Sequence, residues 1–586
     1  MYIRINARKN RDGSKIEYLQ LAHNRRDPAT GRIIPDILYN FGRRDQLDEA
    51  ALRRLVRSIG RLLGPAAAMA EAASGEGLRF VESRPLGSAW LLRGLWERLG
   101  VGAELERLAG EGRHEDPAGL AGTIFGLVAN RALEPRSKRA AAEWLNGDVA
   151  APGVPDRLYD ERLYRAMDFL RGGEEEIQRR VFFATADLLN LEVDLLLYDT
   201  TSAYFEMEGD DEERQERAAA WAAYDRGEGE EPWFTRPQVV NEPAMRLPGH
   251  SRDHRPDRAQ VVVGLAVTRE GIPVRCWVFP GNTSDAKTVA TVKQSLAGWR
   301  LGRVVWAVDR GMVSTENLAE LAKGGAYYIA GERLRAGQPE VEAVLGRAGR
   351  YQAVRDNLEV KEVWLGEGSA RRRHVLVRNP AQVERDRAER AATLARIEAE
   401  LARLPAGGAE HPKAVCRLLT HPTLGRYLTR DRQGRPVVDA AKVKAEERLD
   451  GKYLLVTNDE SLSPGDVALG YKQLAEVERA WRDLKSELDW RPMFHRKADR
   501  IRAHVLLCWL ALLLVRVVEV RTGQTWPRVR QELDRLHQGV FEGPEGRFVQ
   551  RTELTALQLQ YLKAAGVAPP PRFESITAQP AAIPAS

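Results

Sequence analysis

Two short and mainly apolar runs in this chain each end directly at an aspartate. Val193–Tyr198 precedes Asp199, and Val304–Val308 precedes Asp309. Runs of this length and composition predict buried strands. Polar groups at the ends of neighbouring central strands can converge at one edge of a sheet. We therefore expect Asp199 and Asp309 to meet there, the simpler alternative being that each aspartate only shapes a turn at a strand end.

A third acidic residue, Glu478, lies in the strongly helical stretch YKQLAEVERAWRDLK. Three carboxylates at one point repel each other unless cations neutralise them. Their hard oxygen ligands suit Mg²⁺, with Mn²⁺ as a substitute. Two such ions can clamp the attacking and leaving oxygens of a phosphodiester. Asp199, Asp309 and Glu478 are therefore the predicted catalytic residues and metal ligands of an enzyme that cuts and joins nucleic acid.

The spacing around Glu478 adds a second prediction. Tyr471, Glu478 and Lys485 are seven residues apart, so a continuous helix would place them on one face, with Arg482 beside them. A stripe of this composition is poor core material. It predicts a metal ligand flanked by DNA-contacting groups, the alternative being an ordinary Glu478–Arg482 ion pair on a solvated helix.

Charge is high and unevenly distributed along the 586 residues. The formal net charge is +6, which favours an acidic polymer as partner. Residues 1–65 contain 14 Lys and Arg against 7 Asp and Glu, a balance that suits phosphate contacts or a solvated surface. Residues 206–231 contain 11 acidic and 3 basic residues, which we interpret as a solvated loop, the alternative being a regulatory or interface insert.

Several classes of protein are disfavoured by the same sequence. The three cysteines have no CxxC spacing, which fits a reducing cytoplasm better than a disulfide framework or a zinc site. The start of the chain lacks the apolar core of a signal peptide. The longest apolar run, Val505–Val515, is 11 residues long and predicts a buried helix rather than a membrane span.

Changes of pattern divide the chain into six segments. From residue 191 the expected order is βββαβαβ, a mixed sheet with helices on its faces. The six are 1–75, a basic β-meander and a helix at 52–63; 76–190, a helical DNA-binding region; 191–330, the first part of an α/β core; 331–450, an insertion domain of strands and one long charged helix; 451–530, the second part of the core; and 531–586, a helical segment with a tail expected to be disordered from about 568.

Two loops around the predicted core strands deserve separate interpretation. The stretch GHSRDHRPDRAQ contains His254 and Arg255 just before a strand, and predicts phosphate contacts near the acids or a flexible basic loop. The stretch GNTSDAKT predicts a helix start with Ser284 or Asp285 as the N-cap.

Four pieces of the chain resemble the DDE transposases of bacterial insertion sequences. They begin at LYDTTSAYFE, GHSRDHRPDRAQ, VVWAVDRGM and YKQLAEVERAWRDLK, and the resemblance covers roughly 190–520. It is narrowest to the branch with a Tyr-x2-Arg-x3-Glu-x6-Lys signature and a β-rich insertion before the last acid. It implies an RNase H-like core, two Mg²⁺ ions, and Asp199, Asp309 and Glu478 as the acidic trio. The implied activity is strand cleavage at element ends followed by transfer of the freed 3′-OH into target DNA.

The resemblance also implies partners and contacts. These are terminal inverted repeats and target DNA, bound by a homodimer in a synaptic complex beside the bacterial nucleoid. Tyr471, Lys485 and Arg482 would hold the DNA. Leu474 occupies the signature Arg position, so Arg479 or Arg482 is the candidate replacement. Two alternatives stay open, a catalytically silent DNA-binding protein derived from a transposase and a structure-specific nuclease of the same fold.

Overall fold

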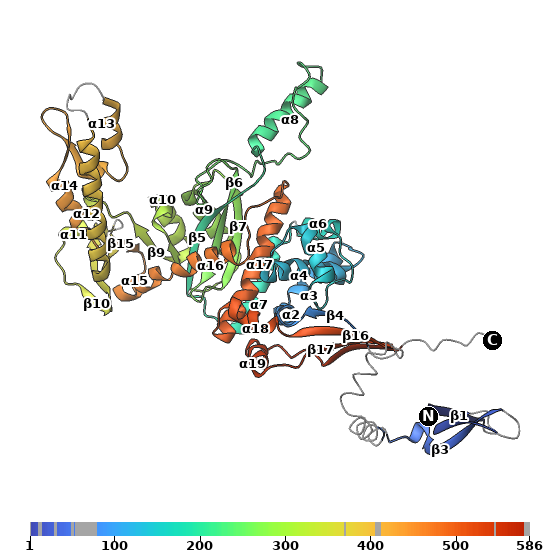
Figure 1. The fold of residues 1–586 in the computed structure, drawn as a ribbon. Helices are drawn as coiled ribbons and strands as arrows, with labels where there is room; N and C mark the ends of the chain where they lie inside the picture. Colours follow the sequence, from blue (N-terminus) through green and yellow to red (C-terminus); the bar gives the residue numbers. More distant parts are fainter. Residues whose placement is uncertain are drawn as a thin grey trace. The chain divides into compact units, whose positions relative to one another are not determined.

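The computed structural model describes residues 2–9, 15–27, 32–48, 52, 79–170, 172–299, 301–368, 371–404, 412–543 and 546–578 (Figure 1). The chain divides into two compact units. The first comprises residues 1–83, 539–550 and 573–586, and the second comprises 84–538 and 551–572. Each unit is described separately below.

The N-terminal segment of the first unit is an antiparallel sheet of three strands in the order β1-β2-β3. The strands are β1 Tyr2–Lys9, β2 Lys15–Arg26 and β3 Ile33–Arg43. Their alternating sequences and the intervening turn signals had predicted this meander, and the prediction is confirmed. The helix predicted at 52–63 lies outside the described residues, apart from Leu52.

A four-stranded sheet with the order β18-β17-β16-β4 joins segments from both ends of the chain. The strands are β4 Arg79–Pro85, β16 His537–Gly543, β17 Gly546–Arg551 and β18 Phe573–Ala578. The predicted disorder from about residue 568 is therefore wrong over β18, because β17 supplies it with an antiparallel partner. Residues 579–586 lie outside the described part of the chain.

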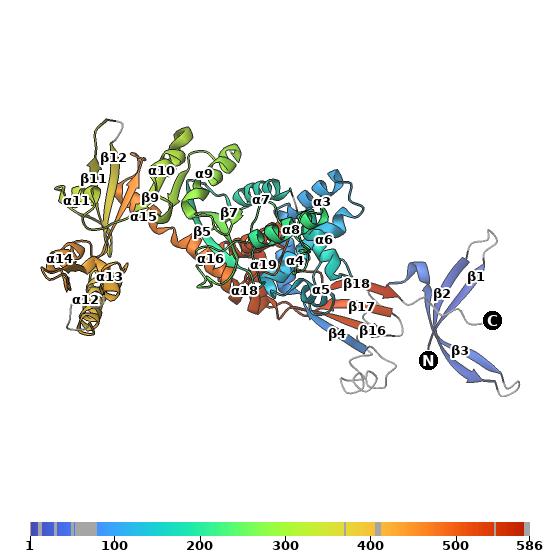
Figure 2. The same cartoon turned by 90° about the horizontal axis from the view of Figure 1, so that it is seen from above.

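The second unit is built on a nine-stranded mixed sheet with the order β10-β11-β12-β15-β9-β8-β5-β6-β7 (Figure 2). Strands β5, β8 and β9 are parallel to one another, and the other neighbours are antiparallel. The strands are β5 Leu195–Tyr204, β6 Gln260–Thr268, β7 Pro273–Pro280, β8 Val305–Val308, β9 Tyr327–Glu332, β10 Gln352–Arg355, β11 Leu358–Leu365, β12 Arg372–Arg378 and β15 Lys452–Thr457. The predicted mixed sheet and the β6–β7 hairpin are both present.

The insertion differs from the separate domain expected at 331–450. Its strands β10 to β12 continue the central sheet, because β12 pairs along its length with β15. Its helical part has a small core of its own. This part comprises α12 Pro380–Ala402, α13 Pro412–Leu419, α14 Ala440–Glu447 and the short strands β13 Leu428–Arg430 and β14 Pro436–Val438. The long charged helix was predicted correctly, whereas the division between insertion and core was not.

Helices cover both faces of the sheet. Alternate residues of β5 point to opposite faces, so Leu195 and Leu197 join one apolar core while Leu196 and Tyr198 join the other. The first core is shared with the N-terminal helices and with α15 to α19, and the second with α9 and α10. The helices are α2 Gly87–Arg98, α3 Val101–Glu111, α4 Pro117–Leu133, α5 Lys138–Gly147, α6 Asp160–Phe169, α7 Glu174–Leu189, α9 Asp285–Leu296, α10 Thr315–Ala322, α11 Pro339–Gly346, α15 Pro464–Lys472, α16 Ala475–Ser486, α17 Ala498–Thr522, α18 Trp526–Leu533 and α19 Ala556–Ala565.

Helix α17 is the predicted buried helix, extended at both ends. By length and composition alone it could cross a membrane, and it is the one such helix among the described residues. However, 89% of its most apolar window is buried inside the protein. It packs against β7, α4 and α6, which is the environment of a core helix.

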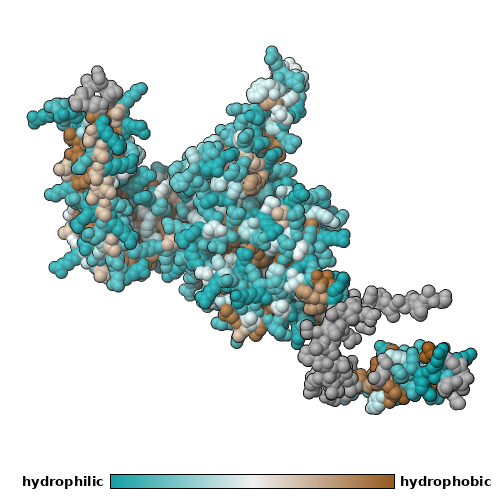
Figure 3. Space-filling model, viewed as in Figure 1, coloured by the Kyte–Doolittle hydropathy of each residue, from teal (hydrophilic) through white to brown (hydrophobic). Residues whose placement is uncertain are grey.

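The acidic segment 206–231 is a helix rather than the expected loop. Asp210 is the N-cap of helix α8 (Asp211–Asp225), and its side chain accepts a hydrogen bond from the Glu213 amide. Asp211 is fully buried and paired with the equally buried Arg246, which fixes the base of the helix. The rest of α8 is exposed or half-buried, and Figure 3 shows hydrophilic side chains interspersed with paler ones over this projection. The composition predicted solvation correctly but missed the N-cap and the buried pair.

Candidate active site

Sheet register brings Asp199 and Asp309 together. Strands β5 and β8 are parallel, and their last paired residues are Tyr198 and Val308. Asp199 and Asp309 are the next residues on the two strands, so they follow side by side. The expectation that Asp199 ends its strand is wrong, because β5 continues to Tyr204 through its pairing with β6. The strand that ends at this level is β8, whose last residue, Val308, pairs with Tyr198. The end of β8 leaves open the edge at which the two carboxylates meet.

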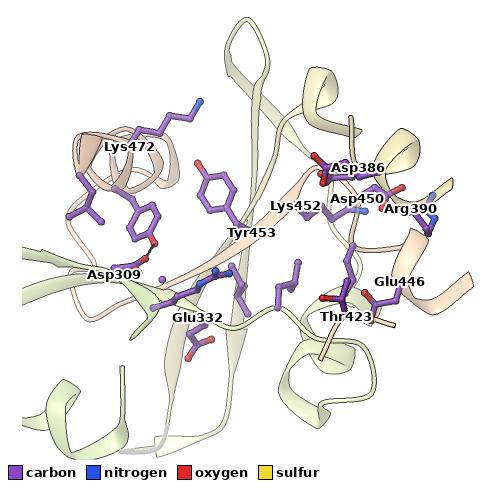
Figure 4. Close-up of a pocket in the computed structure, with 18 of the residues that line it drawn as sticks. Asp309, Glu332, Asp386, Arg390, Thr423, Glu446, Asp450, Lys452, Tyr453 and Lys472 are labelled. Atoms are coloured by element: carbon purple, nitrogen blue, oxygen red, sulfur yellow. Dashed lines mark hydrogen bonds and ion pairs between the residues drawn. The ribbon is translucent and has the colours of Figure 1, made fainter. Parts of the chain in front are cut away.

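The three predicted acids line one cavity of about 830 Å³. Asp199 and Asp309 lie on the sheet, and Glu478 lies in the first turn of α16. The cavity continues between the sheet and the helical part of the insertion, and Figure 4 shows Tyr453 between Asp309 and Asp450. Among the described residues, however, no three His, Cys, Asp or Glu side chains are gathered tightly enough to hold one ion. The site is thus a preformed pair with a third acid along the same wall.

Burial dominates the electrostatics of Asp199. It raises the pKa of this carboxyl to about 6, and the nearby Asp309 and Asp285 carboxylates add to the increase. The guanidinium of Arg252 opposes it, with one nitrogen 3.9 Å from the Asp199 carboxylate. A carboxylate in this position is costly to ionise alone and gains from a cation beside it.

The predicted continuous helix over Tyr471 to Lys485 is wrong. Helix α15 ends at Lys472 and α16 begins at Ala475. At the junction the amides of Gln473 and Leu474 bond three residues back, to Gly470 and Tyr471. Such three-residue bonds tighten the backbone at the junction. Tyr471 therefore belongs to a different helix from Glu478 and Lys485. Tyr471 and Glu478 nevertheless line the same cavity, whereas Lys485 is not among its lining residues.

The break gives Tyr471 a direct role beside the acids. Its hydroxyl donates a hydrogen bond of 3.1 Å to the Asp309 carboxylate. Its ring stacks on that of Tyr453, with centroids 5.9 Å apart. Burial, reinforced by the Asp309 charge, raises the pKa of Tyr471 above its ordinary value, so the hydroxyl remains a donor. Tyr471 thus orients Asp309 in the absence of DNA.

Apart from Tyr471, the predicted DNA-contacting side chains are not among those that line the cavity with the acids. Lys485 donates to the buried Asp253 at 2.9 Å. Arg255 is paired with Asp257 and Glu206, while His254 is exposed in a left-handed turn. Arg482 is also exposed, and its side chain makes no ion pair with Glu478 among the described residues.

The two replacements considered for the signature cation differ in their partners and exposure. Leu474 is 8% exposed and packs in the core at the helix break. Arg479 is engaged by Glu519 at 2.9 Å and lies 4.0 Å from Glu476. Arg482 therefore remains the more available cation on α16.

Sequence reasoning missed several residues of the site. Arg310 and Lys472 line the cavity with the acids, and each directly follows a predicted site residue. Asp285 was interpreted only as a possible helix cap. Ser284 instead occupies the N-cap position of α9, while Asp285 accepts hydrogen bonds from Thr200 and Arg252. The signal for Asp285 was three-dimensional, because only the tertiary fold brings the start of α9 beside Thr200 of β5.

Comparison with known families matches two parts of the chain. Residues 240–514 match the model of the transposase DDE domain, which includes Asp309 and Glu478 and begins after Asp199. Residues 3–70 match the N-terminal domain of IS1634 family transposases. The chain is a DDE transposase.

The remaining comparisons add little to this identification. The cryo-EM structure of the piggyBac transposase synaptic complex with hairpin DNA is similar over 71% of this chain and 70% of that one, with 9% identity and a TM-score of 0.33. No curated protein sequence matches the chain. The function of this transposase is DNA transposition of the IS1634 family type, by phosphoryl transfer. DDE transposases generally use divalent metal ions for this chemistry.

Proposed function

We propose that Asp199, Asp309 and Glu478 are the catalytic acids of this transposase, in a core of the RNase H-like type. The strand order β7-β6-β5-β8-β9 supports the core assignment, with three antiparallel strands followed by two parallel ones. The observation that carries the catalytic proposal is the register that sets Asp199 beside Asp309 on the wall of a cavity shared with Glu478.

The donor set fits divalent ions of the Mg²⁺ type. All three candidate ligands are carboxylates, and Asp199 is half-buried beside the carboxylates of Asp309 and Asp285. We propose two Mg²⁺ ions, with Mn²⁺ as a substitute. When bound they would stabilise the charge that develops on the attacking and leaving oxygens. The three acids would hold these ions at the edge of the sheet where β8 ends.

The proposed reaction has two balanced steps at this edge. In the first, a water oxygen bonds to the phosphorus at the element end, and the P–O3′ bond breaks to leave a 3′-OH and a 5′-phosphate. In the second, that 3′ oxygen bonds to a phosphorus of target DNA and displaces the target 3′ oxygen, which takes up a proton. Both steps need in-line positioning and charge stabilisation, without a covalent bond to protein.

The side chains around the cavity suggest how DNA is held. Arg482 and His254 are exposed and available for phosphates, and Arg310 and Lys472 line the cavity. Tyr471, Lys485 and Arg255 would join them only by exchanging their present partners. The terminal inverted repeats are assigned to the N-terminal segments, supported by the charge of residues 1–65.

The assembly and the location belong to the same proposal. The chain would act as a homodimer that holds two element ends in a synaptic complex, in the bacterial cytoplasm beside the nucleoid. The free state of Cys276, Cys416 and Cys508 supports a reducing compartment.

The test is a cleavage assay on a DNA duplex that carries the element's own end, with Mg²⁺, comparing wild type with Asp309→Ala. Asp431→Asn, which removes a half-buried carboxylate paired with Arg435 and outside the cavity of the acids, is the matched control. We expect nicking at the element boundary and strand-transfer products from wild type and the control, and neither from Asp309→Ala. Specific binding without cleavage in Mg²⁺ or Mn²⁺ would instead favour a silent DNA-binding protein, and cleavage without strand transfer a nuclease.

A further inference from the structure

One arginine of the basic loop 249–258, Arg252, lies beside the acid Asp199. Arg255 and Arg258 are paired with Asp257 and Glu206, and neither has an ion pair with the acids among the described residues. Arg252 instead has one nitrogen 2.5 Å from Asp285 and another 3.9 Å from Asp199. Within this loop the cation that reaches the site is therefore Arg252, and not the neighbouring His254 or Arg255 that the sequence favoured.

Asp285 is the anchor of this guanidinium. It lies at the start of α9, where one carboxylate oxygen accepts from the buried Thr200 hydroxyl at 2.7 Å and the other accepts from Arg252. The contact of Arg252 with Asp285 is much shorter than its contact with Asp199. A cation bound at Asp199 would therefore cost Arg252 only its weaker interaction, and the guanidinium can stay in place.

The loop is braced so that Arg252 has little freedom to leave. Its backbone amide donates to the buried Ser202 hydroxyl on β5 at 2.9 Å. The next residue, Asp253, is 3% exposed at its side chain and pairs with Lys485 at 2.9 Å and Arg491 at 3.1 Å. Since Lys485 lies on α16, the same loop connects the Asp199 strand with the Glu478 helix.

We propose that Arg252 is a further catalytic residue, which binds the non-bridging oxygens of the phosphate under attack, and that Asp285 is its positioning residue. This inference rests on the proposed acidic site. A guanidinium has five N–H donors in a planar fork, and Asp285 occupies one end of it. The other end points to Asp199 and is partly open, with 29% of the side chain exposed. A preorganised donor of this kind stabilises negative charge that grows on the phosphate oxygens.

A purely structural ion pair is the competing interpretation, and binding measurements separate the two. The probe is an element-end duplex with either an ordinary phosphate or a neutral methylphosphonate at the scissile position, measured by fluorescence anisotropy with Ca²⁺. We expect wild type to bind the ordinary phosphate roughly tenfold more tightly, and Arg252→Gln to reduce that preference to below about threefold. Arg269→Gln is the matched control, because it removes one exposed arginine–aspartate pair at the β6–β7 turn. It should retain the full preference.

Cleavage rates provide the second readout. We expect Arg252→Gln to slow Mg²⁺-dependent cleavage by roughly 100-fold, the loss typical of one preorganised charge-stabilising donor. Arg252→Lys and Asp285→Asn should give intermediate losses, since a lysine cannot span both partners and an amide holds the guanidinium less firmly. Asp285→Asn also serves as the second test if Arg252→Gln fails to fold, as judged by circular dichroism.

The proposal is overturned if Arg252→Gln keeps the phosphate preference of wild type, or if Arg269→Gln loses as much of it. Failure of the acidic-trio proposal has a different signature. In that case wild type would not cleave at all, whereas the phosphate preference and its loss in Arg252→Gln would still be measurable. The two proposals can therefore fail separately.

Discussion

The strand-borne acids and the helix-borne acid are held by different means. Asp199 and Asp309 follow paired residues of two hydrogen-bonded strands, so the sheet itself sets their separation. Glu478 is exposed in the first turn of α16, just after a break in the helical backbone, and depends on side-chain packing beneath it. We therefore expect the aspartate pair to exist before metal and DNA bind, and Glu478 to join it only in the complex.

The largest expected effects come from removing one acid of each kind, Asp309 after a strand or Glu478 on a helix. Both Asp309→Asn and Glu478→Gln should slow cleavage by at least about 1,000-fold, because each removes charge from the metal site. In DNA-free protein, Asp309→Asn should abolish Mn²⁺ binding, whereas Glu478→Gln should weaken it less than about threefold. Isothermal titration calorimetry measures the Mn²⁺ affinity of each variant. Loss of Mn²⁺ binding in Glu478→Gln would break the comparison, since it would place all three acids in a preformed site.

The next effect concerns the support of the helix-borne acid. Asp253→Asn leaves Lys485 and Arg491 without their buried counter-charge, and should destabilise the fold by about 2–3 kcal/mol, as loss of one partner of a buried ion pair does. Cleavage should fall roughly tenfold because α16 loses its tie to the loop. Urea unfolding measures the change in the free energy of unfolding. The control Asp194→Asn removes an exposed pair with Arg269 and should shift stability by less than about 0.5 kcal/mol.

A pH-dependent effect tests the cost of the preformed pair. The pKa of Asp199 is about 6 in the fold against an ordinary 3.8, so the folded protein holds the proton more tightly. Stability therefore falls as pH rises from about 4 to 6, and the full cost is present above 6. With EDTA at pH 7.5, Asp199→Asn should stabilise the protein by about 1–2 kcal/mol, with no gain near pH 4. Equal stability of the two proteins at both pH values would show that the pair carries no such cost.

The smallest effect concerns the hydroxyl that orients Asp309. Tyr471→Phe removes one hydrogen bond and keeps the ring stacked on Tyr453. We expect a three- to tenfold lower cleavage rate, in line with about 1 kcal/mol for one hydrogen bond. A higher Mg²⁺ concentration for half-maximal cleavage, with unchanged DNA affinity, would support the orienting role. An unchanged rate with weaker DNA binding would make Tyr471 a DNA contact instead.

The comparison also explains what the sequence could predict. Short apolar runs followed by aspartates gave the strands around Asp199 and Asp309, and composition gave the buried helix α17. Local patterns failed where long-range pairing decides the outcome, as in the continuation of β5 beyond Asp199 and the ordering of β18. They also failed at residues 473–474, where helical propensity was high but packing of Leu474 ends one helix and starts another. Asp285 and Arg252 meet only through the tertiary fold.

The pairing of β12 with β15 limits how this protein can be shortened. A deletion of residues 331–450 would leave β15 with a bare edge, since β12 supplies its hydrogen bonds on one side and β9 on the other. Exposed edges of this kind recruit strands from other molecules. A trimmed version that keeps all three acids would thus be prone to aggregate. The insertion cannot be treated as a detachable cassette for engineering, and exchange between relatives would have to carry β15 along with it.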